Sequence, residues 1–221
     1  MDKFKNITII GTSHIAIESI NQISEFIEKN KPEIVGLELD KKRIYGLLNK
    51  TKISIKDVFK MGLKAFIFNL IGSYVEKKLG KLVGVSPGDE MLAAIKLAKK
   101  HKLQLALIDQ NIEITLKRLI KEFSWKEKFR FFWDILKGLI FRKPLIEPFD
   151  LKKVPPKKTI KKLLNLVKER YPSIYKTLIH ERNIVMAKHL KNLMLKYKDS
   201  QILAIVGAGH EDGIIEILKR G

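Results

Sequence analysis

Four short, continuous runs of aliphatic residues, separated by segments with helical spacing, constrain the fold of this chain more than any other feature. The runs cover residues 6–10, 33–37, 103–108 and 201–206. A strand with one exposed face alternates polar and apolar residues, whereas a continuous apolar run fits a strand that is covered on both faces. Sheets covered on both faces are usually parallel, with helices as the crossover connections. We therefore predict an α/β fold with a mainly parallel sheet flanked by helices.

The segments between these runs have the spacing of helices. Two of the helical segments, 56–82 and 125–141, are additional to the helices that a minimal α/β unit needs. The prolines that follow 125–141 indicate a linker. A length of 221 residues suits a single domain. We predict one α/β domain over residues 1–221, with helical insertions at 56–82 and 125–158. The other predicted helices are 17–29, 41–49, 89–101 and 173–197.

Composition excludes several classes of site and indicates the charge of the partner. The chain has no cysteine, which excludes a disulfide scaffold, a cysteine nucleophile, a thiolate zinc site and an iron–sulfur cluster. Its formal net charge of +20 favours an anionic partner. Because the lysines are spread over almost every helix and no nucleic-acid motif is present, we do not expect nucleic acid, and an anionic membrane surface and an acidic partner both stay open. The start of the chain lacks a signal-peptide pattern, so we expect a cytoplasmic protein.

Polar side chains follow each of the four predicted strands. His14, Glu38, Asp109 and His210 all come within a few residues of a strand end. The carboxyl ends of parallel strands lie along one edge of a sheet, where ligands bind. Imidazole and carboxylate groups together are typical ligands of zinc, manganese or cobalt. The sequence therefore predicts a divalent-metal site at this edge, built from these four residues.

The two histidines share a motif, Gly-x-x-His, which begins at Gly11 and again at Gly207. With 13 glycines and 5 histidines in 221 residues, chance predicts only about 0.3 matches. Glycine permits a sharp exit from a strand and a close approach of the backbone to a ligand. The repeated motif therefore favours a functional role for both histidines over hydrogen-bonded loop residues, which is the structural alternative.

The carboxylates at the strand ends also have structural alternatives. Glu38 leaves a buried strand and needs a partner, which Arg43 can supply as a salt bridge. Asp40 is placed to act as the N-cap of helix 41–49. Asp109 is interpreted equally well as a helix cap or as a site residue.

Four more charged residues are candidates for catalysis. Glu90 lies at a helix start, where the helix dipole favours an acidic residue in any case. Glu181 and Arg182 are adjacent in a helix and point in different directions, as solvated or tertiary ion pairs do. Arg182 is also a candidate to reach the strand ends and stabilise an oxyanion. Arg118 is a candidate for the same role.

Six segments follow one another along the chain: GTSHIAIESINQI, PEIVGLELDKKR, PGDEMLAAIKLAKK, LIDQNIEITLKR, ERNIVMAKHL and IVGAGHEDGI. In this order they resemble the TraB/PrgY family, which is related to the Tiki and GumN proteins. The resemblance extends from about Thr8 to Ile215.

This resemblance implies an EreA/ChaN-like fold and a peptide-directed activity. The Tiki branch consists of manganese- or cobalt-dependent metalloproteases that trim N-terminal segments, and PrgY-like members limit a peptide pheromone (pheromone shutdown). Many relatives continue into C-terminal transmembrane helices, which implies membrane association. Carried over to this chain, the family's active site corresponds to His14, Glu38, Arg182 and His210, with Glu90, Asp109, Arg118 and Glu181 at matched motif positions.

Together these features predict a metal-dependent hydrolase, a peptidase, with manganese, cobalt or zinc as cofactor. Arg182 is the expected oxyanion stabiliser, and Glu181 or Glu90 the expected base. One rival is a non-catalytic protein that binds or sequesters peptides on the same fold. Another is a peripheral membrane protein that uses 56–82 or 125–141 on an anionic surface. The apolar side chains of these two segments also lead us to expect a homodimer.

Overall fold

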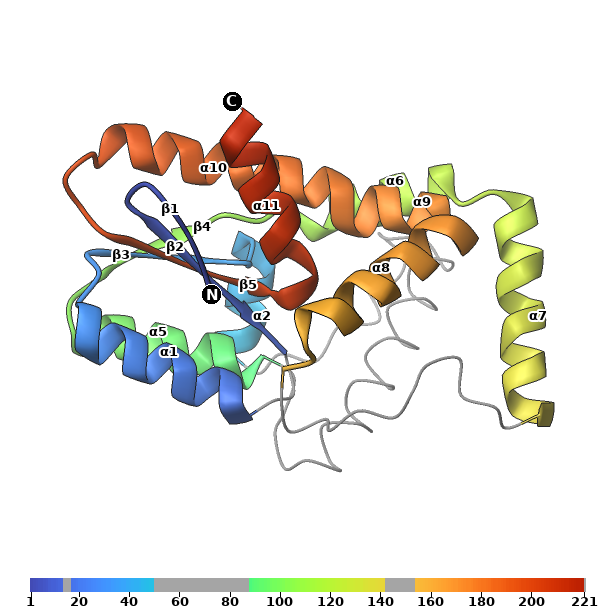
Figure 1. Ribbon diagram of the computed structural model, residues 1–221, viewed down its shortest axis with the longest axis horizontal. Coiled ribbons are helices and arrows are strands. Elements are labelled where there is room, and N and C mark those ends of the chain that lie inside the picture. The colour runs from blue at the N-terminus through green and yellow to red at the C-terminus, as the bar shows by residue number, and fades with distance from the viewer. Residues whose placement is uncertain (14–16, 50–87, 142–153, 221) are drawn as a thin grey trace.

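A five-stranded sheet forms the centre of the protein (Figure 1). The computed structural model describes residues 1–13, 17–49, 88–141 and 154–220. Within these ranges the strand order is β1-β2-β5-β3-β4. The strands are β1 (Asp2–Phe4), β2 (Ile7–Thr12), β3 (Ile34–Leu37), β4 (Gln104–Leu107) and β5 (Ile202–Gly207).

The predicted parallel sheet is confirmed. Strands β2, β5, β3 and β4 are parallel neighbours, so their carboxyl ends lie along the same edge. β1 was not predicted, because it has only three residues and two of them are charged. It pairs with β2 in an antiparallel hairpin.

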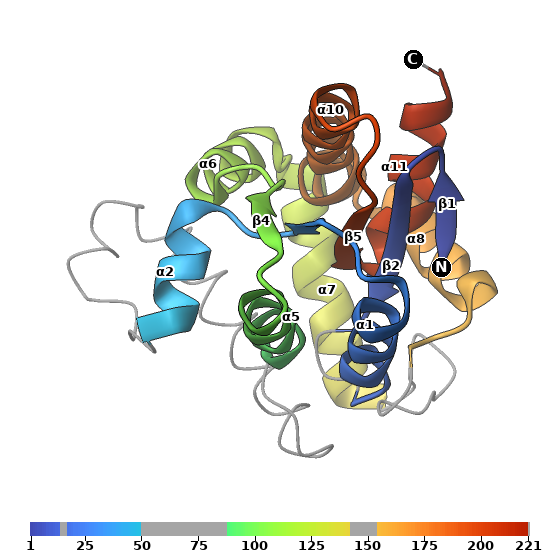
Figure 2. The same ribbon diagram turned by 90° about the vertical axis from the view of Figure 1, so that its left-hand side faces the viewer.

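Helices cover both faces of the sheet, as the continuous apolar strands predicted. In Figure 2, α1 (Ile17–Asn30) and α5 (Asp89–Lys100) lie on one side of the strands. The helices α10 (Glu181–Lys196) and α11 (Ala208–Arg220) lie on the other side. The chain is therefore a three-layer α/β structure.

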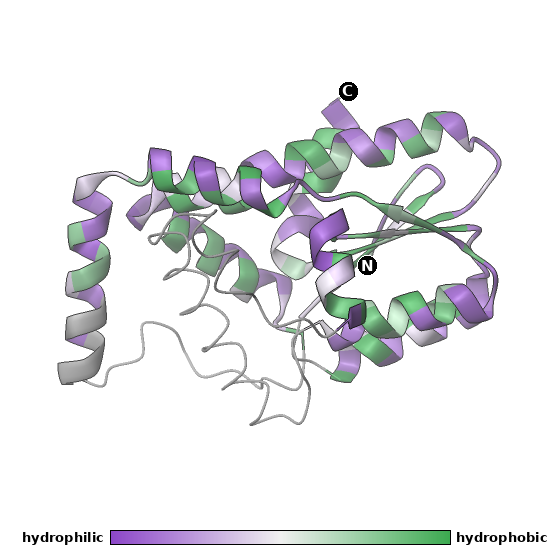
Figure 3. Cartoon of the chain, turned by 180° about the vertical axis from the view of Figure 1, so that it is seen from behind, coloured by the Kyte–Doolittle hydropathy of each residue, from purple (hydrophilic) through white to green (hydrophobic). Residues whose placement is uncertain are grey.

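Alternate residues of each strand enter two different cores. Ile7 and Ile9 of β2 pack with Met186 and Leu190 of α10. Ile10, the next residue, packs in the core formed with α1 and α5. This alternation is the two-residue period of a strand, and it explains why successive residues of these short strands are apolar rather than alternately polar and apolar. Figure 3 shows the hydrophobic strands enclosed between helices that are hydrophilic on their outer sides.

The remaining helices extend beyond the carboxyl edge of the sheet (Figure 1). The predicted helix at 125–141 is present as α7, while 56–82 lies outside the described residues. The division into a domain and its insertions stays a prediction. None of the described helices is both long and apolar enough to cross a membrane. The helices at and beyond the carboxyl edge are α2 (Lys41–Asn49), α6 (Ile112–Glu122), α7 (Trp125–Phe141), α8 (Lys157–Arg170) and α9 (Pro172–Tyr175).

The long helical stretch predicted at 173–197 contains an irregular turn. A π-helical turn covers Lys176–His180 and separates α9 from α10. π-helical turns are rare and often lie at functional sites. Here the turn ends immediately before Glu181 and Arg182, two of the predicted catalytic residues.

Candidate active site

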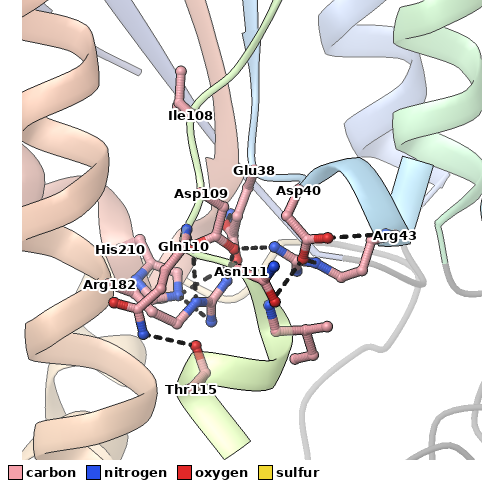
Figure 4. Close-up of polar contacts among 12 residues, drawn as sticks. Glu38, Asp40, Arg43, Ile108, Asp109, Gln110, Asn111, Thr115, Arg182 and His210 are labelled. Atoms are coloured by element: carbon pink, nitrogen blue, oxygen red, sulfur yellow. Dashed lines mark hydrogen bonds and ion pairs between the residues drawn. The ribbon is translucent and has the colours of Figure 1, made fainter. Parts of the chain in front are cut away.

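Arg182, in the first turn of α10, joins polar residues from three strand ends (Figure 4). Its Nη2 donates to Glu38, which follows β3, and to Asp109 Oδ2 at 2.6 Å. Its Nε donates to Asp109 Oδ1 at 3.1 Å. Its Nη1 lies 3.1 Å from His210 Nε2 and donates to the Leu178 carbonyl at 3.2 Å. The prediction that Arg182 reaches the carboxyl edge is therefore confirmed.

Glu38 is held between Arg182 and the end of β5. Its side chain is buried, and Oε2 accepts a hydrogen bond from the backbone N–H of Gly207 at 2.5 Å. Its Oε1 lies 3.5 Å from His210 Nε2. The salt bridge to Arg43 that the sequence offered as an alternative is not formed, because Arg182 takes that place.

The hydrogen bonds of His210 define its tautomer. A guanidinium only donates, so Nε2 must accept from Arg182 and carries a lone pair. Nδ1 therefore carries the proton and donates it to Asn183 Oδ1 at 2.6 Å. His210 is buried and neutral in this arrangement, and its Nε2 lone pair points toward Arg182 and Glu38.

A second arginine continues the network along the sheet edge. Arg43 donates to Asp109 through Nη2 and to Asp40 Oδ2 through Nε at 2.9 Å. Asp40 Oδ1 also accepts from the backbone N–H groups of Lys42 at 2.7 Å and Arg43 at 3.1 Å. The prediction that Asp40 caps the helix at 41–49 is confirmed. Asp109 does not cap a helix: Asn111 caps α6, so Asp109 is free to bind both arginines.

Burial and the neighbouring charged groups shift the pKa values of Arg182 and Asp40 in opposite directions. Burial would lower the pKa of Arg182, but the carboxylates of Glu38 and Asp109 outweigh it and raise this pKa above its ordinary value. Burial would raise the pKa of Asp40, but hydrogen bonds from Arg43 and Lys42 outweigh it and hold this pKa below its ordinary value of 3.8. Arg182 and Asp40 therefore keep their charges at this edge of the sheet.

The other predicted catalytic residues are Glu181 on α10, Arg118 on α6 and Glu90 on α5. Glu181 accepts two hydrogen bonds from Arg118, at 2.5 and 2.6 Å, on the more exposed side of α10. The predicted divergence of Glu181 and Arg182 is thus confirmed. Glu90 is buried in the first turn of α5, which packs against α1 and the ends of β3 and β4. Their catalytic roles stay predictions.

His14 lies outside the described residues, but the strands that lead into the two Gly-x-x-His motifs are adjacent. In the register of β2 and β5, Gly11 lies opposite Val206 and Thr12 opposite Gly207. A Cβ at Gly11 would come within 2.5 Å of Glu211 Oε2, the residue after His210. Glycine at this position therefore lets the first motif pack against the second.

The predicted metal ligands are only partly described. Among the described residues, no three His, Cys, Asp or Glu side chains are grouped so as to hold a metal ion. Glu38 and His210 are close together, and Asp109 is joined to both of them through Arg182. The metal site with His14 stays a prediction.

Asn183 is the site residue that the sequence interpretation missed. It is buried on the core side of α10, three residues before Met186 and seven before Leu190. A polar residue within an apolar helix stripe needs a partner, and this signal was present in the sequence. Its partner is His210.

The sequence of this chain matches known proteins along almost its whole length. The model of the TraB/PrgY/gumN family matches residues 2–221. The chain belongs to this family. It is 39% identical to an uncharacterized protein of Methanocaldococcus jannaschii over 97% of this chain and 54% of that protein. It is 22% identical to the TraB domain-containing protein of Homo sapiens, over 93% of this chain and 61% of the human protein. The TraB domain-containing protein of Mus musculus is also 22% identical.

This TraB/PrgY/gumN family member therefore spans about half of the archaeal relative and about three-fifths of the mammalian ones. The family resemblance on which the sequence analysis relied is confirmed.

Proposed function

We propose that the protein is a divalent-metal-dependent hydrolase that acts on peptides. The observation that carries the proposal is the pairing of a neutral His210 with Glu38. Asn183 fixes the imidazole so that its Nε2 lone pair lies 3.5 Å from Glu38 Oε1. A histidine whose second nitrogen is held by an acceptor is the usual form of a metal-binding histidine.

The donor atoms fit manganese, cobalt or zinc, which accept mixed imidazole and carboxylate ligands. Glu38 and His210 would hold the ion, and we assign the third position to His14 because its motif is adjacent to that of His210. Asp109 is the fourth candidate. When bound, the ion supplies Lewis acidity, which polarises a carbonyl group and acidifies water.

The chain's own residues supply positive charge and proton transfer. Arg182 keeps its charge at the sheet edge, since Asp109 binds two of its nitrogens. It is placed to donate a hydrogen bond to a developing oxyanion. Glu181 and Glu90 are the proposed proton acceptors. Arg118 orients Glu181 through two hydrogen bonds, so its role is to position that carboxylate.

The peptide substrate rests on the family relationship. The matched family includes the PrgY proteins, for which the resemblance implies action on a peptide pheromone. We extend this substrate class, peptides, to the present chain. The alternative within the same class is binding without cleavage, since Arg182 already satisfies both Glu38 and His210 with hydrogen bonds.

Metal titration tests the proposal. Mn²⁺, Co²⁺ or Zn²⁺ should raise the melting temperature, because a ligand that binds only the native state stabilises it. The shift should disappear in His14→Ala and His210→Ala and persist in His180→Ala, a control that changes an exposed histidine two residues before Arg182. The same metals should activate hydrolysis of short peptides.

Two results would contradict the proposal. A shift that is equal in all three variants and the native protein would place the ion elsewhere. Peptide binding without turnover, in the presence of each metal, would favour the sequestering protein.

A further inference from the structure

α7 turns its aromatic side chains to solvent. Trp125, Phe129, Phe132 and Trp133 are 79%, 71%, 62% and 47% exposed. Separations of three and four residues place these rings on one side of the helix. The rings of Phe129 and Trp133 stack, with centroids 6.4 Å apart and planes 8° from parallel. We name these four side chains the aromatic face.

The opposite side of α7 is held to the protein mainly by polar contacts. Glu127 accepts from the backbone N–H of Ser173 at 2.8 Å. Asp134 accepts two hydrogen bonds from Arg170 Nη2, both 2.6 Å. Phe131 also faces this side. A surface helix ordinarily buries its apolar face and exposes its polar one. In the part of α7 from Trp125 to Asp134 this arrangement is reversed, since the large rings are exposed and the two carboxylates face inward, so the aromatic face is available to a partner.

The charges on the exposed side of α7 are basic. Lys126, Arg130 and Lys137 are exposed, whereas the two acidic residues of the helix, Glu127 and Asp134, make the inward contacts. Because Lys126, Arg130 and Lys137 are four and seven residues apart, they lie on one side of the helix, along the edge of the aromatic face. The partner must therefore accept large rings and positive charge side by side.

The position of α7 makes this face accessible. Figure 1 shows α7 at the end of the molecule farthest from the sheet, and standing across the direction of α8 and α10. Figure 3, from behind, shows hydrophobic and hydrophilic residues alternating along the described part of α7 at the outer limit of the molecule. A helix at this place can meet an extended surface without hindrance from the α/β layers.

We propose that the aromatic face of α7 binds the surface of an anionic lipid bilayer. Tryptophan and phenylalanine insert at the boundary between headgroups and acyl chains, while lysine and arginine contact the lipid phosphates. A second copy of the chain fits less well, because its α7 would bring the same basic side chains into contact. The net charge of +20 opposes such self-association and favours an anionic surface.

Tryptophan fluorescence provides a direct test on the full chain. Both tryptophans of the protein, Trp125 and Trp133, belong to the aromatic face. Vesicles of phosphatidylcholine with phosphatidylglycerol should shift the emission to shorter wavelength and sediment the protein. Pure phosphatidylcholine vesicles should do so weakly, and added salt should reduce binding to the anionic vesicles.

Variants separate the two parts of the surface. Phe129→Ser with Phe132→Ser keeps both tryptophans and should lower the partition coefficient at least about tenfold. Lys126→Gln and Lys137→Gln should each lower it about fivefold on anionic vesicles. Tyr45→Ser removes an aromatic ring that is 65% exposed on α2, and should leave vesicle binding unchanged.

Other results would overturn the proposal. Absence of vesicle binding, or binding that the double phenylalanine variant does not weaken, would show that α7 is not the lipid contact. Self-association in solution that the same double variant abolishes, without any response to vesicles, would identify the aromatic face as the homodimer interface.

Discussion

Asn183 accepts the Nδ1 proton of His210 at 2.6 Å and so determines which nitrogen of the imidazole faces Glu38. Both side chains are buried, and they belong to different helices, α10 and α11. This hydrogen bond connects α10 to α11 within the candidate active site.

Asn183→Leu should remove the hydrogen bond that determines the tautomer of His210. The Nδ1–H of His210 would lose its acceptor inside the protein, which costs about 1–3 kcal/mol of unfolding free energy. We expect the Nε2–H tautomer to appear in ¹⁵N NMR spectra of the imidazole. Asn30→Leu, which changes an exposed amide at the end of α1, should alter neither stability nor spectrum. An unchanged His210 spectrum in Asn183→Leu would mean that Arg182 alone determines the tautomer.

Arg182→Lys should be strongly destabilising. One ammonium group cannot reproduce the planar donors that contact Glu38, Asp109 and His210 together, so buried carboxylate oxygens lose their partners. Breaking a buried ion pair costs roughly 3–5 kcal/mol when one partner is removed, and we expect the lysine variant to lose about 3 kcal/mol in denaturant unfolding.

Arg118→Lys is the matched control for Arg182→Lys. Arg118 also pairs with a carboxylate through two nitrogens, but its side chain is 46% exposed, against 15% for Arg182. Exposed pairs are screened by water and contribute little, so Arg118→Lys should lose much less stability than Arg182→Lys. Equal losses in the two variants would contradict the view that burial makes the Arg182 contacts strong.

The sequence predicted the helix and sheet layers of the fold, but it did not predict the order of the strands within the sheet. Continuous aliphatic runs identified β2, β3 and β5, which are covered on both faces, and also β4, although this edge strand is partly exposed. The insertion of β5 between β2 and β3 was not predicted, because strand order depends on long-range packing that leaves no local pattern. The π-helical turn before α10 was missed for a similar reason: Lys176–His180 has ordinary helical composition.

The sequence placed three described residues of the candidate site at one edge of the sheet, but it did not predict their pairings, and it missed Asn183. Strand-end position correctly brought Glu38, Asp109 and His210 together, because the carboxyl ends of parallel strands share one edge. The choice of Arg182 rather than Arg43 as the partner of Glu38 depends on how far α10 reaches over that edge. No local spacing encodes this distance.

Stability should fall in acid with a contribution from Asp40. The pKa of this carboxyl is below 3.8 in the folded protein, so the unfolded chain takes up its proton first as the pH falls. The stabilisation is therefore complete above pH 3.8 and is lost as the pH drops through the lower, folded-state pKa. Denaturant unfolding at a series of pH values should show a shallower acid slope in Asp40→Asn. A slope identical to that of the native protein would exclude Asp40 as a contributor.

Gly213→Ala should disturb His210 without touching it. A Cβ at Gly213, in the middle of α11, would overlap Asn183 Nδ2 and come within 3.2 Å of Asn183 Cγ. Asn183 is buried and cannot swing into solvent, so its amide must shift and its bond to His210 must lengthen. Overpacking of this kind costs roughly 1–3 kcal/mol, although alanine favours a helix over glycine by about 1 kcal/mol.

Gly209→Ala isolates the packing effect, because Gly209 lies in the same helix and next to His210. The nearest atom to a Cβ there is Leu164 Cδ2 at 3.7 Å, an ordinary contact. This variant should keep the native stability or gain slightly, and its His210 resonances should stay in place. Gly213→Ala should instead lose stability, shift those resonances and weaken the metal-dependent rise in melting temperature. If both variants behave alike, Asn183 does not position His210, and the imidazole must owe its orientation to Arg182.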